Sequence, residues 1–132
     1  MTLLDTHVLL WLVLGDARLG RRASAAVRAA ERTRTLAVSA ISFWEIEMLG
    51  QRRRVEVEDT LGLRRAVLGA GVRELPIDGE VALAAAGLPG LHRDPANRFI
   101  AASAVMHDAT LVTANARLLD WRESLRRIDA RA

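Results

Sequence analysis

The sequence predicts an α/β domain in which helices cover both faces of a mostly parallel sheet. Its 132 residues suit a single domain, 1–132, because two halves would each have only a marginal core. Hydrophobic residues make up 51% of the chain, which is enough for a sizeable core. Short apolar segments alternate with helical ones, and this order is typical of a parallel sheet that is buried on both faces.

Five short apolar segments predict the strands. The first ends at Asp5, and the third is closed by Pro76. The segments are 2–4, 35–39, 72–75, 110–113 and an edge strand at 126–129. Parallel sheets of this kind bind ligands beyond the carboxyl ends of their strands. Polar residues that directly follow a strand are therefore the first candidates for a functional site.

The helices are predicted from apolar periodicity and from the residues that start and stop them. Asp59, Asp78 and Asp94 are each suited to cap the helix that follows. Gly15 closes the first helix. The expected helices are 6–14, 19–32, 41–53, 60–69, 81–86, 95–107 and 116–121.

The charge balance permits a nucleic-acid partner without requiring one. All 19 basic residues are arginine, against 16 acidic residues, and the formal net charge is +3. The chain has no Cys, which excludes disulfides and thiolate metal sites. The apolar run 8–14 lacks a basic leader and is shorter than the about 20 residues of a membrane span. We therefore expect a cytoplasmic protein without a membrane segment.

Four polar residues lie where a strand ends or a helix begins. Asp5 follows the first strand, where it could line the crevice at the sheet edge or cap the next helix. Asp94 fits the cap of a helix, and capping alone explains it. Asn97 lies on the apolar face of that helix and needs a polar partner. Asn115 follows the fourth strand, where a turn or a helix cap is its simplest role.

Glu45 occupies a helical position that demands an explanation. On a helical wheel of the helix predicted at 41–53, an apolar arc is defined by Ile41, Trp44, Met48 and Leu49. Glu45 falls within this arc, whereas Glu47 falls outside it. A carboxylate that faces a core is costly unless it is paired. Glu45 would then bind a cation or form a buried ion pair with an arginine, and Glu47 would be solvated.

Several other functional patterns are missing from the sequence. The three histidines lack metal-ligand spacing, and no Ser–His–Asp context or glycine-rich phosphate loop is present. No helix-turn-helix or basic-helix pattern stands out, which argues against a plain DNA-binding module. The arginine clusters are expected in solvent, where they could also attract RNA phosphates; they are 52–54, 64–65 and 126–127.

Four segments together resemble the PIN-domain ribonucleases, in particular the VapC toxins of type II toxin–antitoxin pairs. They are LLDTHVLLW at 3–11, SAISFWEIEML at 39–49, HRDPANRFIAASA at 92–104 and TLVTANARLL at 110–119. The resemblance covers nearly the whole chain, and four matches in order are much more specific than any single one. It implies a three-layer α/β/α sandwich with a central parallel sheet, which agrees with the alternation of strands and helices.

The resemblance also implies metal-dependent hydrolysis of RNA phosphodiester bonds. The family uses a cluster of acids to hold Mg²⁺ or Mn²⁺. Asp5, Glu45 and Asp94 match these acids and are the expected catalytic residues and metal ligands. The ion would orient and activate a water molecule and neutralise the scissile phosphate.

Two positions that are usually acidic in the family carry amides here, Asn97 and Asn115. Together with Thr6 and Thr113 they would orient the metal ligands through hydrogen bonds. An amide adds no negative charge, so a second ion is poorly supported. The alternative function is a weakened or silent PIN domain that binds RNA or a protein. Arg98 is a candidate phosphate contact, with a surface ion pair as the alternative.

The resemblance further implies two protein partners, a small VapB-like antitoxin that blocks the site and a second copy of the chain. Either interface requires exposed apolar residues. Trp11, Leu12 and Trp44 are candidates, although core packing is the favoured role of each.

Overall fold

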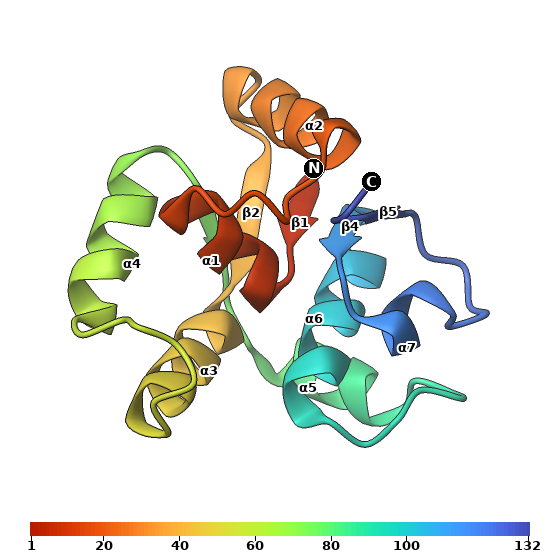
Figure 1. The fold of residues 1–132 in the computed structure, drawn as a ribbon. Coiled ribbons are helices and arrows are strands. Elements are labelled where there is room, and N and C mark those ends of the chain that lie inside the picture. The colour runs from red at the N-terminus through yellow and green to blue at the C-terminus, as the bar shows by residue number, and fades with distance from the viewer.

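A five-stranded parallel sheet forms the centre of the computed structural model, which describes residues 1–132 (Figure 1). The order β3-β2-β1-β4-β5 places β1 in the middle, and every neighbouring pair is parallel. The strands are Thr2–Leu4 (β1), Leu36–Ser39 (β2), Arg73–Leu75 (β3), Thr110–Thr113 (β4) and Arg127–Asp129 (β5). Each lies within one residue of its predicted position, and the prediction of a mostly parallel sheet is confirmed.

Helices cover both faces of this sheet (Figure 1). Successive strand residues point to opposite faces. Leu4 and Val112 therefore pack under α1 and α2, whereas Leu3 and Leu111 pack under α6. The helix α5 packs against the outside of α6. The predicted α/β/α layers are confirmed, with helices Thr6–Leu14 (α1), Arg21–Arg32 (α2), Ala40–Gln51 (α3), Thr60–Gly69 (α4), Gly79–Ala86 (α5), Pro95–Met106 (α6) and Ala116–Leu119 (α7).

The main differences from the predicted elements lie at helix ends. α2 begins two residues later than predicted, because Leu19 still belongs to the preceding turn and donates its N–H to the carbonyl of Asp16. α3 ends two residues early, where Arg53 adopts a left-handed backbone with φ of 55°. No helix combines the length and the apolar character that crossing a bilayer requires.

The last residues of the chain are tied to the start of α2. The N–H of Gly20 donates to the carbonyl of Ala130 at 2.8 Å, and the N–H of Arg22 donates to that of Ala132 at 2.9 Å. A Cβ at Gly20 would collide with the Ala132 carbonyl, so this position requires glycine for close approach of the two backbones. Residues 130–132 therefore have a defined place beside the loop that precedes α2.

Candidate active site

The candidate site lies at the carboxyl ends of β1 and β4. A cavity of about 280 Å³ opens there, and Asp5, Glu45 and Asp94 all line it. Asn97 and Asn115 line the same cavity. The structure thus brings together five residues that lie in four separate segments of the sequence. The other lining residues are His7, Trp11, Arg18, Ala114 and Arg131.

Asp5 combines the two roles that its position left open, because it caps a helix and also lines the cavity. Its Oδ1 accepts the N–H of Thr6 at 2.8 Å, and its Oδ2 accepts the hydroxyl of Thr113 at 2.6 Å. Burial raises the pKa of Asp5 above its ordinary value. The hydrogen bonds from Thr113 and Thr6 oppose this rise, and the nearby charge of Asp94 adds to it. A cation in the cavity would favour the charged carboxylate.

Thr6 and Thr113 connect the elements around Asp5. The Thr113 hydroxyl, which donates to Asp5, also accepts the N–H of Asn115 at 3.0 Å. The Thr6 hydroxyl donates to the hydroxyl of Ser42 at 2.9 Å and so links α1 to α3. Both threonines are fully buried. These hydroxyl groups hold the starts of α1 and α7 and the first turn of α3 around one cavity.

Glu45 faces the cavity, but the apolar arc predicted around it is wrong. The arc placed Trp44 in the core, whereas Trp44 is 55% exposed. The buried residues of α3 are instead Ser42, Phe43 and Ile46. The reason is that α3 packs against three helices, namely α1, α4 and α6. These neighbours, rather than the apolar periodicity of its sequence, determine which side of α3 is buried.

The electrostatics of Glu45 follow from partial burial beside two like charges. Burial raises the pKa of Glu45 above its ordinary value, the Thr6 side chain opposes the rise, and the charges of Asp5 and Asp94 add to it. No arginine forms an ion pair with Glu45, so the alternative of a buried ion pair is excluded. Glu47 is exposed, as predicted.

Asp94 and Asn97 lie at the start of α6. Asp94 Oδ1 caps this helix by accepting the N–H groups of Ala96 at 3.1 Å and Asn97 at 3.5 Å. Asn97 is buried, and its amide nitrogen lies 3.2 Å from Nε2 of His92. His92 is therefore the polar partner that Asn97 needs. The sequence pattern alone did not indicate this role, although His92 lies in the same short segment as Asp94.

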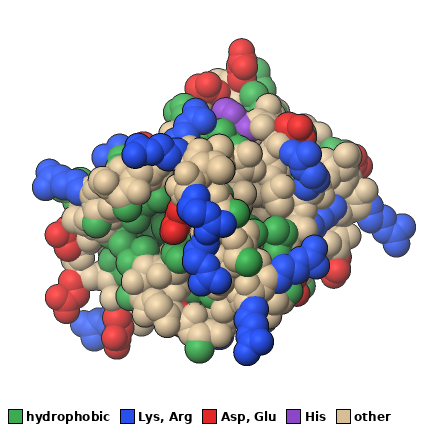
Figure 2. Space-filling model, turned by 90° about the horizontal axis from the view of Figure 1, so that it is seen from above, with side chains coloured by type: hydrophobic (Ala, Val, Ile, Leu, Met, Phe, Trp, Pro, Cys, Tyr) green, Lys and Arg blue, Asp and Glu red, His purple; other side chains and the backbone are tan.

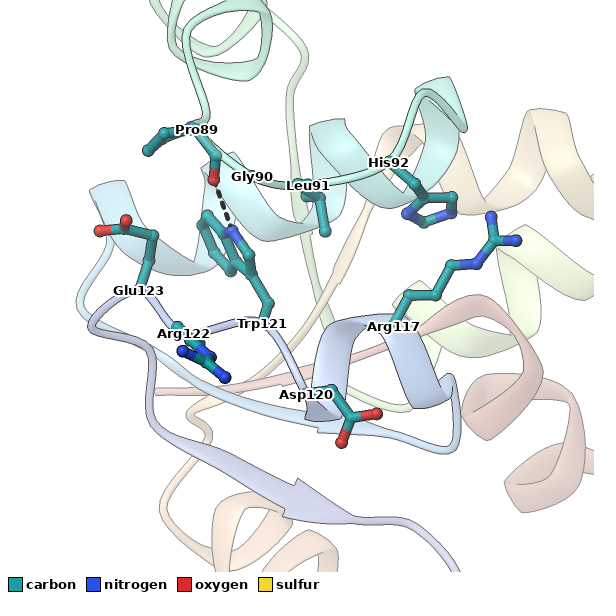
Figure 3. Close-up of a pocket in the computed structure, with 9 residues that line it drawn as sticks. All are labelled: Pro89, Gly90, Leu91, His92, Arg117, Asp120, Trp121, Arg122 and Glu123. Atoms are coloured by element: carbon teal, nitrogen blue, oxygen red, sulfur yellow. Dashed lines mark hydrogen bonds between the residues drawn. The ribbon is translucent and has the colours of Figure 1, made fainter.

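His92 also borders a second hollow beside the site (Figure 3). This hollow measures about 490 Å³ and lies between the loop before α6 and the segment that contains α7. Figure 3 shows the His92 ring facing the side chain of Arg117, while Trp121 donates its indole N–H to the Pro89 carbonyl at 2.8 Å. None of the three clustered acids lines it, so the hollow is separate from the candidate active site.

Asn115 has the capping role that its position predicts. Its Oδ1 accepts the N–H groups of Arg117 at 2.9 Å and Leu118 at 3.4 Å, at the start of α7. The same residue lines the cavity. The Oδ1 of Asn115 is therefore engaged in capping α7, and only its Nδ2 group has no partner in the helix.

The structure corrects the prediction that Arg98 contacts a phosphate or forms a surface ion pair. All five N–H groups of a guanidinium can donate, and those of Arg98 point at five backbone carbonyls at 2.8–3.3 Å. The acceptors are the carbonyls of Ala85, Ala86, Leu88, Leu91 and His92. Arg98 therefore fastens the end of α5 and the following loop to α6, and no donor remains for a ligand.

Arg98→Gln should accordingly destabilise the fold without a specific effect on RNA. Several carbonyls would lose charged donors at once, so we expect the free energy of unfolding to fall by about 2–4 kcal/mol. Urea denaturation measures this loss. Arg93→Gln is the matched control, since Arg93 is exposed and makes no hydrogen bond or ion pair. A stable Arg98→Gln variant with weakened RNA binding would reinstate the phosphate contact.

The donor atoms at the site suit a hard divalent cation. Asp5, Glu45 and Asp94 supply carboxylate oxygens to one cavity, and their mutual repulsion raises the pKa of Asp5 and Glu45 beyond the effect of burial. No three acidic or histidine side chains are close enough to surround an ion unaided. Mg²⁺ usually keeps several waters and needs only one or two carboxylates plus a substrate phosphate. The residues therefore fit a partly hydrated ion rather than an enclosed one.

Comparison with known proteins identifies the family. The PIN domain matches residues 2–123, and the chain therefore belongs to the PIN domain family. The chain is 36% identical over 121 residues to Ribonuclease VapC22 from Mycobacterium tuberculosis (strain ATCC 25618 / H37Rv), with 91% of each sequence covered. The resemblance read from the four sequence segments is thus confirmed.

Solved structures confirm the PIN-like fold. VapBC2 from Rickettsia felis, bound to a DNA fragment from its promoter, matches with a TM-score of 0.71 at 17% identity over 96% of both chains. FitAcB from Neisseria gonorrhoeae matches with a TM-score of 0.67 at 22% identity over 98% of both chains. At these identities the similarity establishes the fold alone.

Proposed function

We propose that this chain is an endoribonuclease toxin of the VapC type, which hydrolyses RNA phosphodiester bonds with Mg²⁺ or Mn²⁺. The observation that carries the proposal is the convergence of Asp5, Glu45 and Asp94 on one cavity at the carboxyl end of the sheet. Sheets of this kind bind their ligands there. A relative that is 36% identical bears the name ribonuclease, which supports the same reaction class. With RNA as its substrate, this chain would act in the cytoplasm.

The three acids would divide the work according to their surroundings. When bound, a divalent ion supplies a Lewis acid that neutralises the scissile phosphate and lowers the pKa of a water molecule. Asp5 presents a fixed carboxylate, since Thr6 and Thr113 hold its two oxygens. Asp94, at the exposed start of α6, would be the second ligand. Glu45 has a raised pKa and is suited to bind the ion or orient the attacking water.

The two amides favour a second function, a PIN domain with weak or no catalysis that binds RNA or a protein. Asn97 and Asn115 bring no negative charge, and each is engaged in a structural hydrogen bond, with His92 and with α7 respectively. Their carbonyl oxygens are weak substitutes for carboxylates toward a hard ion. Metal-dependent cleavage of RNA separates this function from the first.

We further propose a VapB-like antitoxin and a second copy of the chain as partners. The structural relative from Rickettsia felis is a VapBC2 assembly, which supports the first of these. Four hydrophobic side chains on α1, α3 and α4 are at least 45% exposed and are candidates for contact with a partner, namely Val13, Leu14, Trp44 and Leu61. Figure 2 shows hydrophobic side chains gathered toward the side on which α4 lies. Trp11 is buried and unsuited to this role.

Incubation of the purified chain with a panel of RNAs in Mg²⁺, Mn²⁺ or EDTA tests the proposed reaction. We expect cleavage with an ion and none in EDTA. An Asp94→Asn variant, purified in parallel, should lose cleavage and so control for contaminating ribonuclease. Asn caps helices as well as Asp does, so the start of α6 should survive. Cleavage that persists in EDTA or in Asp94→Asn would contradict the proposal, and RNA binding without cleavage would support the second function.

A further inference from the structure

Two arginines line the cavity together with its acids. Trp11, a buried residue of α1, carries two guanidinium groups against its ring. The Cζ atoms of Arg18 and Arg131 lie 4.9 Å and 5.2 Å from the ring centroid, within the range of cation–π contacts. Both arginines are exposed and line the same cavity as the carboxylates. Their positions in the sequence are more than a hundred residues apart.

Each arginine is held in place but keeps unused donors. Arg18 is paired with Asp16, which accepts from its Nη2 at 2.7 Å and from its Nε at 3.1 Å, leaving Nη1 without a protein partner. Arg131 donates from Nη1 to the Ala114 carbonyl at 3.1 Å, leaving Nε and Nη2 free. The cation–π contact with Trp11 uses no N–H group as a hydrogen-bond donor. The free donors are therefore available to a ligand.

Backbone contacts fix the two arginines relative to one another. The loop with Arg18 and the end with Arg131 are joined by the hydrogen bond from Gly20 to Ala130, and the close approach of Gly20 to Ala132 reinforces this junction. The basic pair therefore depends on tertiary contacts rather than on two mobile surface side chains. This arrangement contrasts with Arg98, whose five donors are all consumed by carbonyls.

We propose that Arg18 and Arg131, held over the ring of Trp11 by cation–π contacts, bind a phosphate of the RNA strand adjacent to the one that is cleaved. This inference rests on the proposed function. A strand that enters the cavity meets both the carboxylates and the two arginines, and a phosphate beside the scissile one would be attracted by the arginines. RNA is favoured over an acidic protein segment as the ligand, because the proposed reaction already brings RNA phosphates to the cavity that these arginines line. Arg18 and Arg131 are positioning residues for the substrate.

Binding of a short fluorescein-labelled single-stranded RNA in EDTA at several salt concentrations tests the inference. Arg18→Gln and Arg131→Gln should each weaken binding by about 3–10-fold at low salt and reduce the slope of log K against log salt by about 0.7. Arg131→Lys keeps the charge and should retain part of the affinity. Arg28→Gln, on the exposed side of α2, is the matched control and should bind as wild type does.

Steady-state cleavage in Mn²⁺ supplies a second readout. The Gln variants should raise KM with little change in kcat, and thermal melting should show that they remain folded. Unchanged RNA affinity and unchanged KM in folded variants would overturn the inference. It would also be overturned if the Gln variants lost binding to a poly-glutamate peptide but bound RNA as wild type does. If wild type cleaves no RNA, the proposed reaction fails, but the binding measurements in EDTA still decide the role of the two arginines.

Discussion

Replacing Asp5 by Asn should abolish metal-dependent RNA cleavage and stabilise the metal-free protein at neutral pH. We expect cleavage to fall by about 10²-fold or more, because a fixed carboxylate is lost from the position of the ion. Stability should rise because burial raises the pKa of Asp5, which makes its charged form unfavourable in the fold. Asn has nearly the same shape, retains an oxygen for the N–H of Thr6, and can donate from Nδ2 to the Thr113 hydroxyl in place of the bond that Asp5 accepts from it.

The dependence of stability on pH has a defined sign. A carboxyl group with a raised pKa in the fold contributes stability that is fully present below its ordinary pKa and is lost as the pH rises through the raised value. Both Asp5 and Glu45 have raised pKa values. Their contribution to the free energy of unfolding in EDTA should therefore fall from acidic toward neutral pH. The difference between Asp5→Asn and wild type, from urea denaturation at several pH values, isolates the part due to Asp5.

Glu47→Gln is the matched control for this experiment, since it removes one negative charge from an exposed position outside the site. It should leave cleavage and stability close to those of wild type. Added Mn²⁺ should stabilise wild type by mass action and so reduce the advantage of Asp5→Asn. An Asp5→Asn variant that cleaves RNA normally, or that is less stable than wild type in EDTA at neutral pH, would show that the site is not organised around this charge.

The strands could be predicted within one residue because a short strand buried on both faces leaves a continuous apolar run between polar neighbours. The ends of α2 and α3 were harder to predict. They are decided by individual contacts and backbone angles, such as the hydrogen bond from Leu19 to Asp16 and the left-handed backbone of Arg53. Apolar periodicity carries no information on either.

Residues of the site could be predicted from the sequence where they also cap a helix. Asp5, Asp94 and Asn115 all cap helices, and caps have a sequence signature. Arg98 could not be read in this way, because its partners are carbonyls presented by α5 and the loop after it. Glu45 was correctly predicted to point inward, although the buried face of α3 was predicted incorrectly. A helical wheel carries no information on which elements will pack against the helix.

The pair formed by Arg18 and Arg131 could not be predicted from the sequence for a related reason. An arginine in a basic chain is by default a solvated residue, and nothing local distinguishes these two from the other seventeen. Only the fold brings both to the ring of Trp11 and to the cavity that the acids line. The charges of this cavity are therefore a tertiary property, because its acids and its arginines come from distant parts of the chain.

The amides of the site permit the opposite experiment, in which acids are added. Asn115→Asp should preserve the start of α7, since one carboxylate oxygen can take over the cap and the other becomes available to the cavity. Asn97→Asp would place a carboxylate beside Nε2 of His92, which can donate to it. Both substitutions are therefore compatible with the hydrogen bonds already present, and the change that remains is negative charge.

In the double variant we expect the affinity for Mn²⁺ to increase by about tenfold or more, together with faster metal-dependent cleavage. The melting temperature in EDTA should fall, because two further carboxylates repel Asp5, Glu45 and Asp94. The stabilisation gained from added Mn²⁺ should become larger than in wild type. Thermal melting with and without Mn²⁺, and cleavage of the same RNA panel, measure these effects.

Ser124→Asp adds an acid at an exposed position outside the cavity, and it is the control for added charge. It should change neither the affinity for Mn²⁺ nor cleavage. If Asn97→Asp and Asn115→Asp behave like this control, the two positions do not belong to the ion site, which then consists of Asp5, Glu45 and Asp94 alone. A lower melting temperature in EDTA with no recovery in Mn²⁺ would mean that the added carboxylates repel their neighbours but cannot reach a shared ion. Tighter binding of Mn²⁺ without faster cleavage would mean that the amides limit affinity for the ion and not the chemical step.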